Sequence, residues 1–137
     1  AEYLGAQRED LKAITGPDVI SALATLLPEV ERVFLTGERG REMAASLRWS
    51  VAQGIWGWFD DDVAFTEPWG VDLAAVDMPL SIYQGAEDLM VPPAHGRWLA
   101  SAIPGAQTVF ADGHGHLSLA GECLDSGLAR LREALDQ

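Results

Sequence analysis

Apolar positions in the second half of the chain form two short runs with a helical stretch between them. Residues 78–84 and 107–110 have the pattern of short buried strands, and residues 93–103 have the pattern of a helix. A helix that crosses between two successive buried strands favours a parallel pair, because a parallel connection needs about a dozen residues or more. This half of the chain therefore predicts an α/β fold.

The first part of the chain, to about residue 65, has a helical pattern. Pro17, with Thr15 or Gly16 before it, is typical of a helix start. Apolar residues then recur at helical spacing, at Val19, Leu23, Leu26, Leu27 and Val30. Pro28 is expected to break or restart this helix.

A further helix is predicted over residues 41–53, after a turn at residues 37–40. Met43, Leu47 and Val51 would share one of its faces. Two glycines and the acidic run at residues 60–62 follow, and we expect them to end the helical region in a solvated turn.

The last helix carries an apolar stripe suited to packing on a sheet, formed by Leu124, Leu128, Leu131 and Leu135. Two strands alone make a poor sheet, because a buried strand without a neighbour leaves backbone groups unpaired. The pattern therefore indicates the end of a larger sheet.

Composition and charge narrow the function classes. With 137 residues and 48% hydrophobic content, the chain is long enough for one domain with a core. The net charge is −12 and the nine lysine and arginine residues are scattered, so a basic stripe for phosphate groups is missing. No apolar run approaches the roughly 20 residues that span a bilayer. We therefore expect neither nucleic acid nor a membrane as a partner.

The N-terminus and the cysteine content bear on location. Residues 1–4 lack the basic and hydrophobic stretches of a signal peptide, and we expect a processed or truncated start because no methionine begins the chain. Cys123 is the only cysteine, which excludes an internal disulfide and favours a reducing compartment such as the cytoplasm. We expect Cys123 to be a buried structural thiol.

An acid and a histidine follow the two predicted strands. Asp88 comes after the first strand and His116 after the second, which brings both to the carboxyl edge of a parallel sheet, where open α/β sheets bind ligands. A carboxylate that orients an imidazole is part of a nucleophilic triad, in which the histidine acts as general base and then as general acid. Glu87 is the alternative for the acid of the triad. Asp88 and His116 could each also be loop residues without a catalytic role.

These motifs resemble the C-terminal part of the α/β-hydrolase superfamily. The matching segments are the acid loop Gly85-x-x-Asp88-x-x-Val91-Pro92, the helix-to-strand joint Ile103-Pro104-Gly105-Ala106 and the histidine loop Gly115-His116-Leu117. The resemblance extends from about residue 69 to the end. It implies that residues 1–66 are a segment of a helical cap and residues 67–137 a core segment with the last two parallel strands. It also implies Asp88 and His116 as catalytic residues, with no cofactor and no metal.

The nucleophile of that family is missing from the chain. It stands on a G-x-S-x-G turn before the acid, and no serine here has those flanking glycines. The serines are Ser21, Ser46, Ser50, Ser81, Ser101, Ser118 and Ser126. We therefore expect the nucleophile and the oxyanion hole upstream, and the isolated chain to be inactive. The parent would cleave a small, fairly apolar ester, thioester or amide, or, with an aspartate nucleophile, act as an epoxide hydrolase or dehalogenase.

Two alternatives belong to other classes. Asp112, His114 and His116 alternate along an extended segment, which could form a small metal-binding domain. The chain could also be a non-catalytic interaction module, whose first strand pairs with a second copy or with a separate N-terminal half.

The remaining candidates have simpler interpretations. His114 is expected to be a solvent-facing loop residue and His95 to lie on a helix surface. The aromatic residues Trp56, Trp58, Phe59 and Trp69 are expected mostly to pack at the junction of cap and core.

Overall fold

The computed structural model describes residues 2–135, and they divide into two compact units. The helical unit comprises Ala1–Leu23 and Leu35–Val71, and the α/β unit comprises Ala24–Phe34 and Asp72–Gln137. The elements in chain order are α1 (Glu2–Ala13), α2 (Gly16–Ala22), α3 (Glu29–Phe34), α4 (Glu38–Ser50), α5 (Trp56–Thr66), the 3-10 helix η1 (Leu73–Ala75), β1 (Ser81–Gly85), α6 (Pro93–Ala102), β2 (Gln107–Ala111) and α7 (His116–Leu135). Each unit is described by itself.

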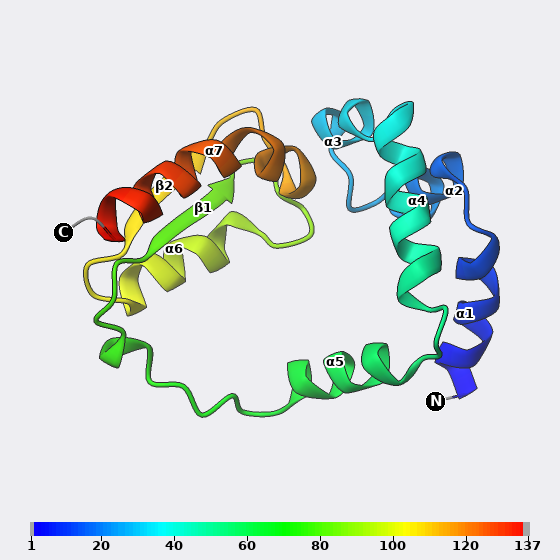
Figure 1. Cartoon of the computed structure of the whole chain (residues 1–137), viewed down its shortest axis with the longest axis horizontal. Coiled ribbons are helices and arrows are strands. Elements are labelled where there is room, and N and C mark those ends of the chain that lie inside the picture. The colour runs from blue at the N-terminus through cyan, green and yellow to red at the C-terminus, as the bar shows by residue number, and fades with distance from the viewer. Residues whose placement is uncertain (1, 136–137) are drawn as a thin grey trace. The chain divides into compact units, whose positions relative to one another are not determined.

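In the helical unit, α4 packs against α2 and α1 (Figure 1). The buried apolar residues of this unit are Leu4, Val19, Leu35, Ala44 and Val51. Gly16 of α2 and Gly40 of α4 lie backbone to backbone, and a Cβ atom on Gly40 would overlap the carbonyl oxygen of Leu35. A Cβ atom on Gly16 would lie only 2.9 Å from the Gly40 carbonyl carbon, so the close approach of the two helices depends on glycine at position 16, whereas glycine at position 40 makes room for Leu35.

The predicted start of the first of these helices is confirmed. Thr15 is the N-cap of α2, and its backbone N–H donates to the carboxylate of Asp18 at 2.9 Å. The hydrogen bond from the Thr15 hydroxyl lowers the pKa of Asp18 most, and the bond from this N–H lowers it further. Because that pKa is lower in the folded chain than in the unfolded chain, the contact stabilises the fold above the unfolded pKa and is lost as the pH falls through the folded pKa.

Two predicted boundaries in this unit are wrong. Helix α4 begins at Glu38, so Gly40 lies inside it and the turn is at residues 35–37. The acidic run at residues 60–62 lies within α5, not in a turn. Gly57 is only the second residue of α5, where it costs the helix little, and the helix ends before Pro68, because the residue before a proline favours extended backbone.

The α/β unit contains a two-stranded parallel sheet, β1 beside β2, with Ser81 opposite Gln107 and Gly85 opposite Ala111. Helices α6 and α7 lie on opposite faces of the sheet (Figure 1). The predicted parallel strands and the crossing helix are therefore confirmed, each within a few residues, and the unit has a mixed α/β fold.

The segment Ala24–Phe34 belongs to the α/β unit, whereas the sequence predicted a helical cap segment over residues 1–66. Helix α3 in this segment packs against α7. Helix α2 ends at Ala22, so Leu23 and Leu26 lie in a turn and not in the predicted helix, and α3 begins directly after Pro28, which confirms a restart there. The sequence pattern could not assign α3 to the second unit, because its contacts come from a helix much later in the chain.

The leucine stripe of α7 does not pack on the sheet, contrary to the prediction. Leu124, Leu128, Leu131 and Leu135 are each at least 55% exposed. Where α7 meets β1, Gly127 lies against the Tyr83 ring, and the buried apolar side chain of α7 is Leu119. A sheet of two strands is too narrow to cover the rest of the helix.

Two of the aromatic residues expected to pack are also exposed. Trp56 is 64% and Trp69 is 70% exposed, although the Trp69 indole N–H donates to the carbonyl oxygen of Ala64 at 2.7 Å. Trp58 and Phe59 are half-buried. Among residues 2–135, no helix combines the length and the apolar character needed to cross a membrane.

The Gly16–Gly40 contact can be tested by adding one methyl group. Gly16→Ala should lower the free energy of unfolding by about 1–3 kcal/mol, because the backbone at Gly40 must move to admit the Cβ atom. Gly5→Ala in α1 is the control, because a Cβ atom there meets nothing within 4 Å and alanine is the better helix former. Urea unfolding of both variants measures the difference, and equal effects would contradict the contact.

Candidate active site

Asp88 lies in the turn that follows β1, and its carboxylate is held by the backbone of that turn. The side chain is only 4% exposed. Its Oδ1 atom accepts hydrogen bonds from the N–H groups of Met90, at 2.9 Å, and Val91, at 2.8 Å. These two bonds compensate the burial of the charge and leave Oδ2 for another partner.

That partner is His116. Asp88 Oδ2 lies 2.9 Å from His116 Nδ1, so the structure brings together the two residues that the sequence singled out. His116 is the first residue of α7, and its side chain is 43% exposed. Because Nδ1 faces the buried carboxylate, Nε2 is the ring nitrogen left for a substrate or a nucleophile.

Gly85 allows the acid turn and the histidine loop to meet. A Cβ atom on Gly85 would overlap the carbonyl oxygens of His114 and Gly115. The Glu87 N–H also donates to the His114 carbonyl oxygen, at 2.9 Å. The two loops therefore touch through their backbones, which sets the distance between Asp88 and His116.

Gln84, at the end of β1, is a site residue that sequence reasoning missed. Its side chain is buried, and its amide nitrogen donates to the Val91 carbonyl oxygen at 3.0 Å, with Asp88 Oδ2 further away at 3.4 Å. Gly96 of α6 leaves the room for it. A polar residue inside an apolar strand run was the signal that could have found it.

Glu31 is a second residue that sequence reasoning missed. It comes from α3, is 1% exposed, and its carboxylate binds the first turn of α7 directly after His116. No local pattern indicated this role, because its partners lie 86 and 87 residues further along the chain.

The other candidates lie away from the Asp88–His116 pair. Glu87, the rival acid, is exposed, and His95 is exposed on the first turn of α6, as predicted. His114 is half-buried, so the prediction that it faces solvent is wrong, and Cys123 is half-buried where burial was expected.

The metal alternative required Asp112, His114 and His116 to converge. In the part of the chain that the structure describes, no three histidine, cysteine or acidic side chains are grouped so that they could hold a metal ion. The arrangement gives the metal-binding alternative no support.

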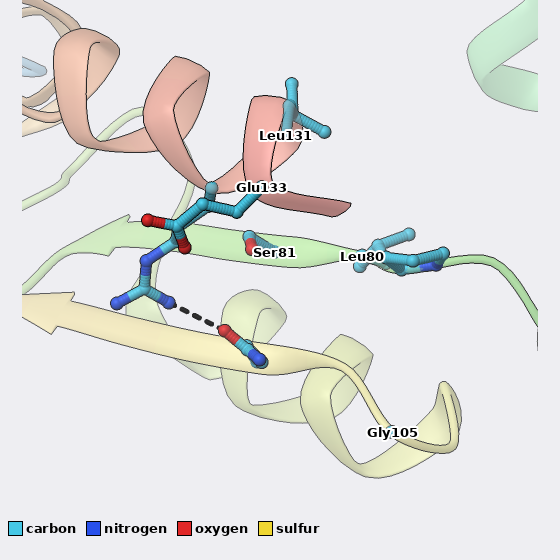
Figure 2. A pocket seen from close by; sticks show the side chains of 8 residues that line it. Leu80, Ser81, Gly105, Leu131 and Glu133 are labelled. Carbon is cyan, nitrogen blue, oxygen red and sulfur yellow. Dashed lines mark hydrogen bonds between the residues drawn. The ribbon is translucent and has the colours of Figure 1, made fainter. Parts of the chain in front are cut away.

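Two cavities lie beside the sheet. One, of about 430 Å³, is at the amino ends of the strands, next to Ser81 and Gly105, and contains the hydrogen bond from Arg130 to Gln107 (Figure 2). It is at the opposite end of the sheet from Asp88 and so is not part of this site. The other, of about 350 Å³, has an almost wholly apolar lining that includes Leu124 and reaches His116.

No protein-family model, curated protein or solved structure matches the chain. The chemistry of the site is therefore inferred from its geometry and from the sequence motifs.

The backbone contact between the acid turn and the histidine loop predicts that a methyl group added at Gly85 destabilises the fold. Gly85→Ala should lower the free energy of unfolding by about 1–3 kcal/mol and weaken the hydrogen bond between His116 and Asp88, because the loops must separate. Gly127→Ala is the control, since a Cβ atom there makes only ordinary contact with Tyr83, at 3.6 Å. NMR signals of the His116 ring, with urea unfolding, measure both effects. Unchanged His116 signals in Gly85→Ala would refute the contact.

Proposed function

We propose that the chain is the C-terminal portion of an α/β-fold hydrolase, in which Asp88 and His116 are the acid and the base of a catalytic triad. The observation that carries the proposal is the 2.9 Å contact between a buried carboxylate and a partly exposed imidazole. This is the geometry in which a carboxylate selects the tautomer of a histidine and stabilises its charged form.

The topology also supports the proposal. Asp88 and His116 follow neighbouring parallel strands, at the edge where open α/β sheets place ligands. Within the described residues β1 pairs only with β2, so its other edge is open to a further strand of a larger sheet. An upstream half of such a fold would add strands there.

The mechanism follows from the two ring nitrogens. Nε2 of His116 takes the proton from an upstream serine hydroxyl as its oxygen attacks the substrate carbonyl carbon, and Asp88 stabilises the imidazolium. The imidazolium then gives this proton to the leaving group, which departs and leaves an acyl-enzyme. Water, deprotonated by the same nitrogen, releases the acid product.

The serine nearest to His116 in sequence is not that nucleophile. The Ser118 hydroxyl donates to Glu31 at 2.6 Å and accepts the Gly115 N–H at 3.0 Å, so both its proton and its oxygen are engaged. Ser81 begins β1, at the other end of the sheet. The isolated chain is therefore expected to be inactive.

The substrate class follows from the resemblance of the motifs. A small, fairly apolar ester, thioester or amide suits a serine nucleophile, and an upstream aspartate would instead make an epoxide hydrolase or a dehalogenase. The proposal places the enzyme in the cytoplasm, supported by a single cysteine without a disulfide partner.

Activity of a longer protein tests the proposal. If the reading frame extends upstream through a G-x-S-x-G turn, that protein should hydrolyse p-nitrophenyl acetate, and the chain of residues 1–137 should not. Asp88→Asn should lower kcat by about 10³- to 10⁴-fold and His116→Ala by at least as much. Glu87→Gln is the matched control and should keep near-normal activity. Full activity in Asp88→Asn would refute the triad.

A non-catalytic interaction module is the second candidate, favoured by the open edge of β1 and the exposed leucine stripe of α7. Light scattering over a hundredfold range of protein concentration tests it. A mass that rises with concentration supports self-association through these surfaces. A constant monomer mass counts against a second copy as the partner.

A further inference from the structure

The Glu31 carboxylate is buried against the first turn of α7. Its Oε2 atom accepts the Leu117 N–H at 2.8 Å, and its Oε1 atom accepts the Ser118 N–H at 2.9 Å and the Ser118 hydroxyl at 2.6 Å. All three partners are donors, which suits an ionised carboxylate. Glu31 therefore satisfies N–H groups that have no partner within the helix.

Helix α7 needs this distant carboxylate because it has no local capping side chain. The residue before His116 is Gly115, whereas helices usually begin after a residue whose side-chain oxygen binds these N–H groups. A Cβ atom at position 115 would overlap Glu31, and the Gly115 carbonyl oxygen also lies against Gly85. Glycine at position 115 therefore leaves the space beside the start of α7 to the Glu31 carboxylate.

We propose that Glu31 is a positioning residue for His116. The residues on both sides of His116 belong to the Glu31 network, because Leu117 donates to the carboxylate directly and Gly115 donates to the Ser118 hydroxyl, at 3.0 Å. The backbone of His116 is thereby held while its ring meets Asp88. The consequence of this positioning for catalysis rests on the proposed hydrolase function.

Glu31 is itself held by its own segment. The neighbouring Arg32 donates to the carbonyl oxygens of Leu27, at 3.0 Å, and Ala24, at 2.6 Å, which ties α3 to the turn before it. Asp88, in contrast, is held by the amides of its own turn. The two partners of the pair are therefore fixed by separate networks, and changing Glu31 should affect His116 without releasing Asp88.

NMR of the chain with labelled histidine nitrogens tests the positioning directly. In Glu31→Gln, one end of the amide would turn a donor toward the donors of α7, so the turn should loosen. We expect the Nδ1–H signal of His116 to weaken or disappear and the ring nitrogen shifts to move toward those of a free imidazole. Glu29→Gln is the matched control, because Glu29 is on the same helix and exposed.

A variant that only destabilises the fold distinguishes the positioning of His116 from a purely structural role of Glu31. Ile103, 6% exposed, lies at the other end of the sheet, and Ile103→Ala should lower the melting temperature while leaving the His116 signals unchanged. All spectra are taken at a temperature where circular dichroism shows each variant folded. Unchanged His116 signals in folded Glu31→Gln would overturn the proposal, as would equal losses in Glu31→Gln and Ile103→Ala.

Ser118→Ala keeps the proposal testable if Glu31→Gln does not fold. It removes one of the three bonds to Glu31 and the acceptor of the Gly115 N–H, so the Nδ1–H signal of His116 should weaken in part. A Ser118→Ala variant with His116 signals identical to the unmodified chain would overturn the proposal in that case.

Kinetics of the longer protein separate this proposal from the proposed function. Glu31→Gln should lower kcat about 10- to 100-fold with KM within about twofold, because His116 acts in the chemical step. If the longer protein hydrolyses no substrate but the NMR loss occurs, the hydrolase proposal fails and the positioning role stands. If it is active and Glu31→Gln changes neither kcat nor the NMR signals, only the positioning role fails.

Discussion

The close approach of Gly85 and Gly115 is the constraint on which the α/β unit depends. Because Gly85 has no Cβ atom, the acid turn and the histidine loop touch through backbone atoms, and Asp88 comes within hydrogen-bond distance of His116. Gly115 has no side chain to cap α7, and the first N–H groups of that helix bind Glu31 instead. That requirement explains why the segment Ala24–Phe34 belongs to the α/β unit and not to the helical unit.

The α/β unit buries four polar side chains, Gln84, Asp88, Glu31 and Ser118, and each has hydrogen-bond partners. Burying a charge costs free energy unless hydrogen bonds compensate it, and well-packed apolar residues often stabilise a fold as well or better. Asp88 and the network of Glu31 and Ser118 together hold His116, whose imidazole is 43% exposed.

Sequence patterns were most reliable where a local rule decides the structure. The helix start at Thr15, the helix start after Pro28 and the two strands were recovered because capping, proline geometry and apolar runs act over a few residues. Gly57 and residues 60–62 were wrongly predicted to end the helical region. The effect of such residues depends on their position within a helix, and Gly57 lies at the start of α5. The α7 leucines were misassigned because an apolar stripe shows which side avoids water and not whether a surface is there to cover it.

The sequence by itself determined a mixed α/β unit with Asp88 and His116 at the same edge of a parallel pair, because strand order and the direction of a crossover fix which ends meet. Only the tertiary structure decided that Oδ2 faces Nδ1, that Gln84 lies beside the acid and that Glu31 holds the start of α7. Those contacts join residues up to 87 positions apart. Their geometry depends on which backbone segments can approach one another closely, and the spacing of residues along the chain does not indicate this.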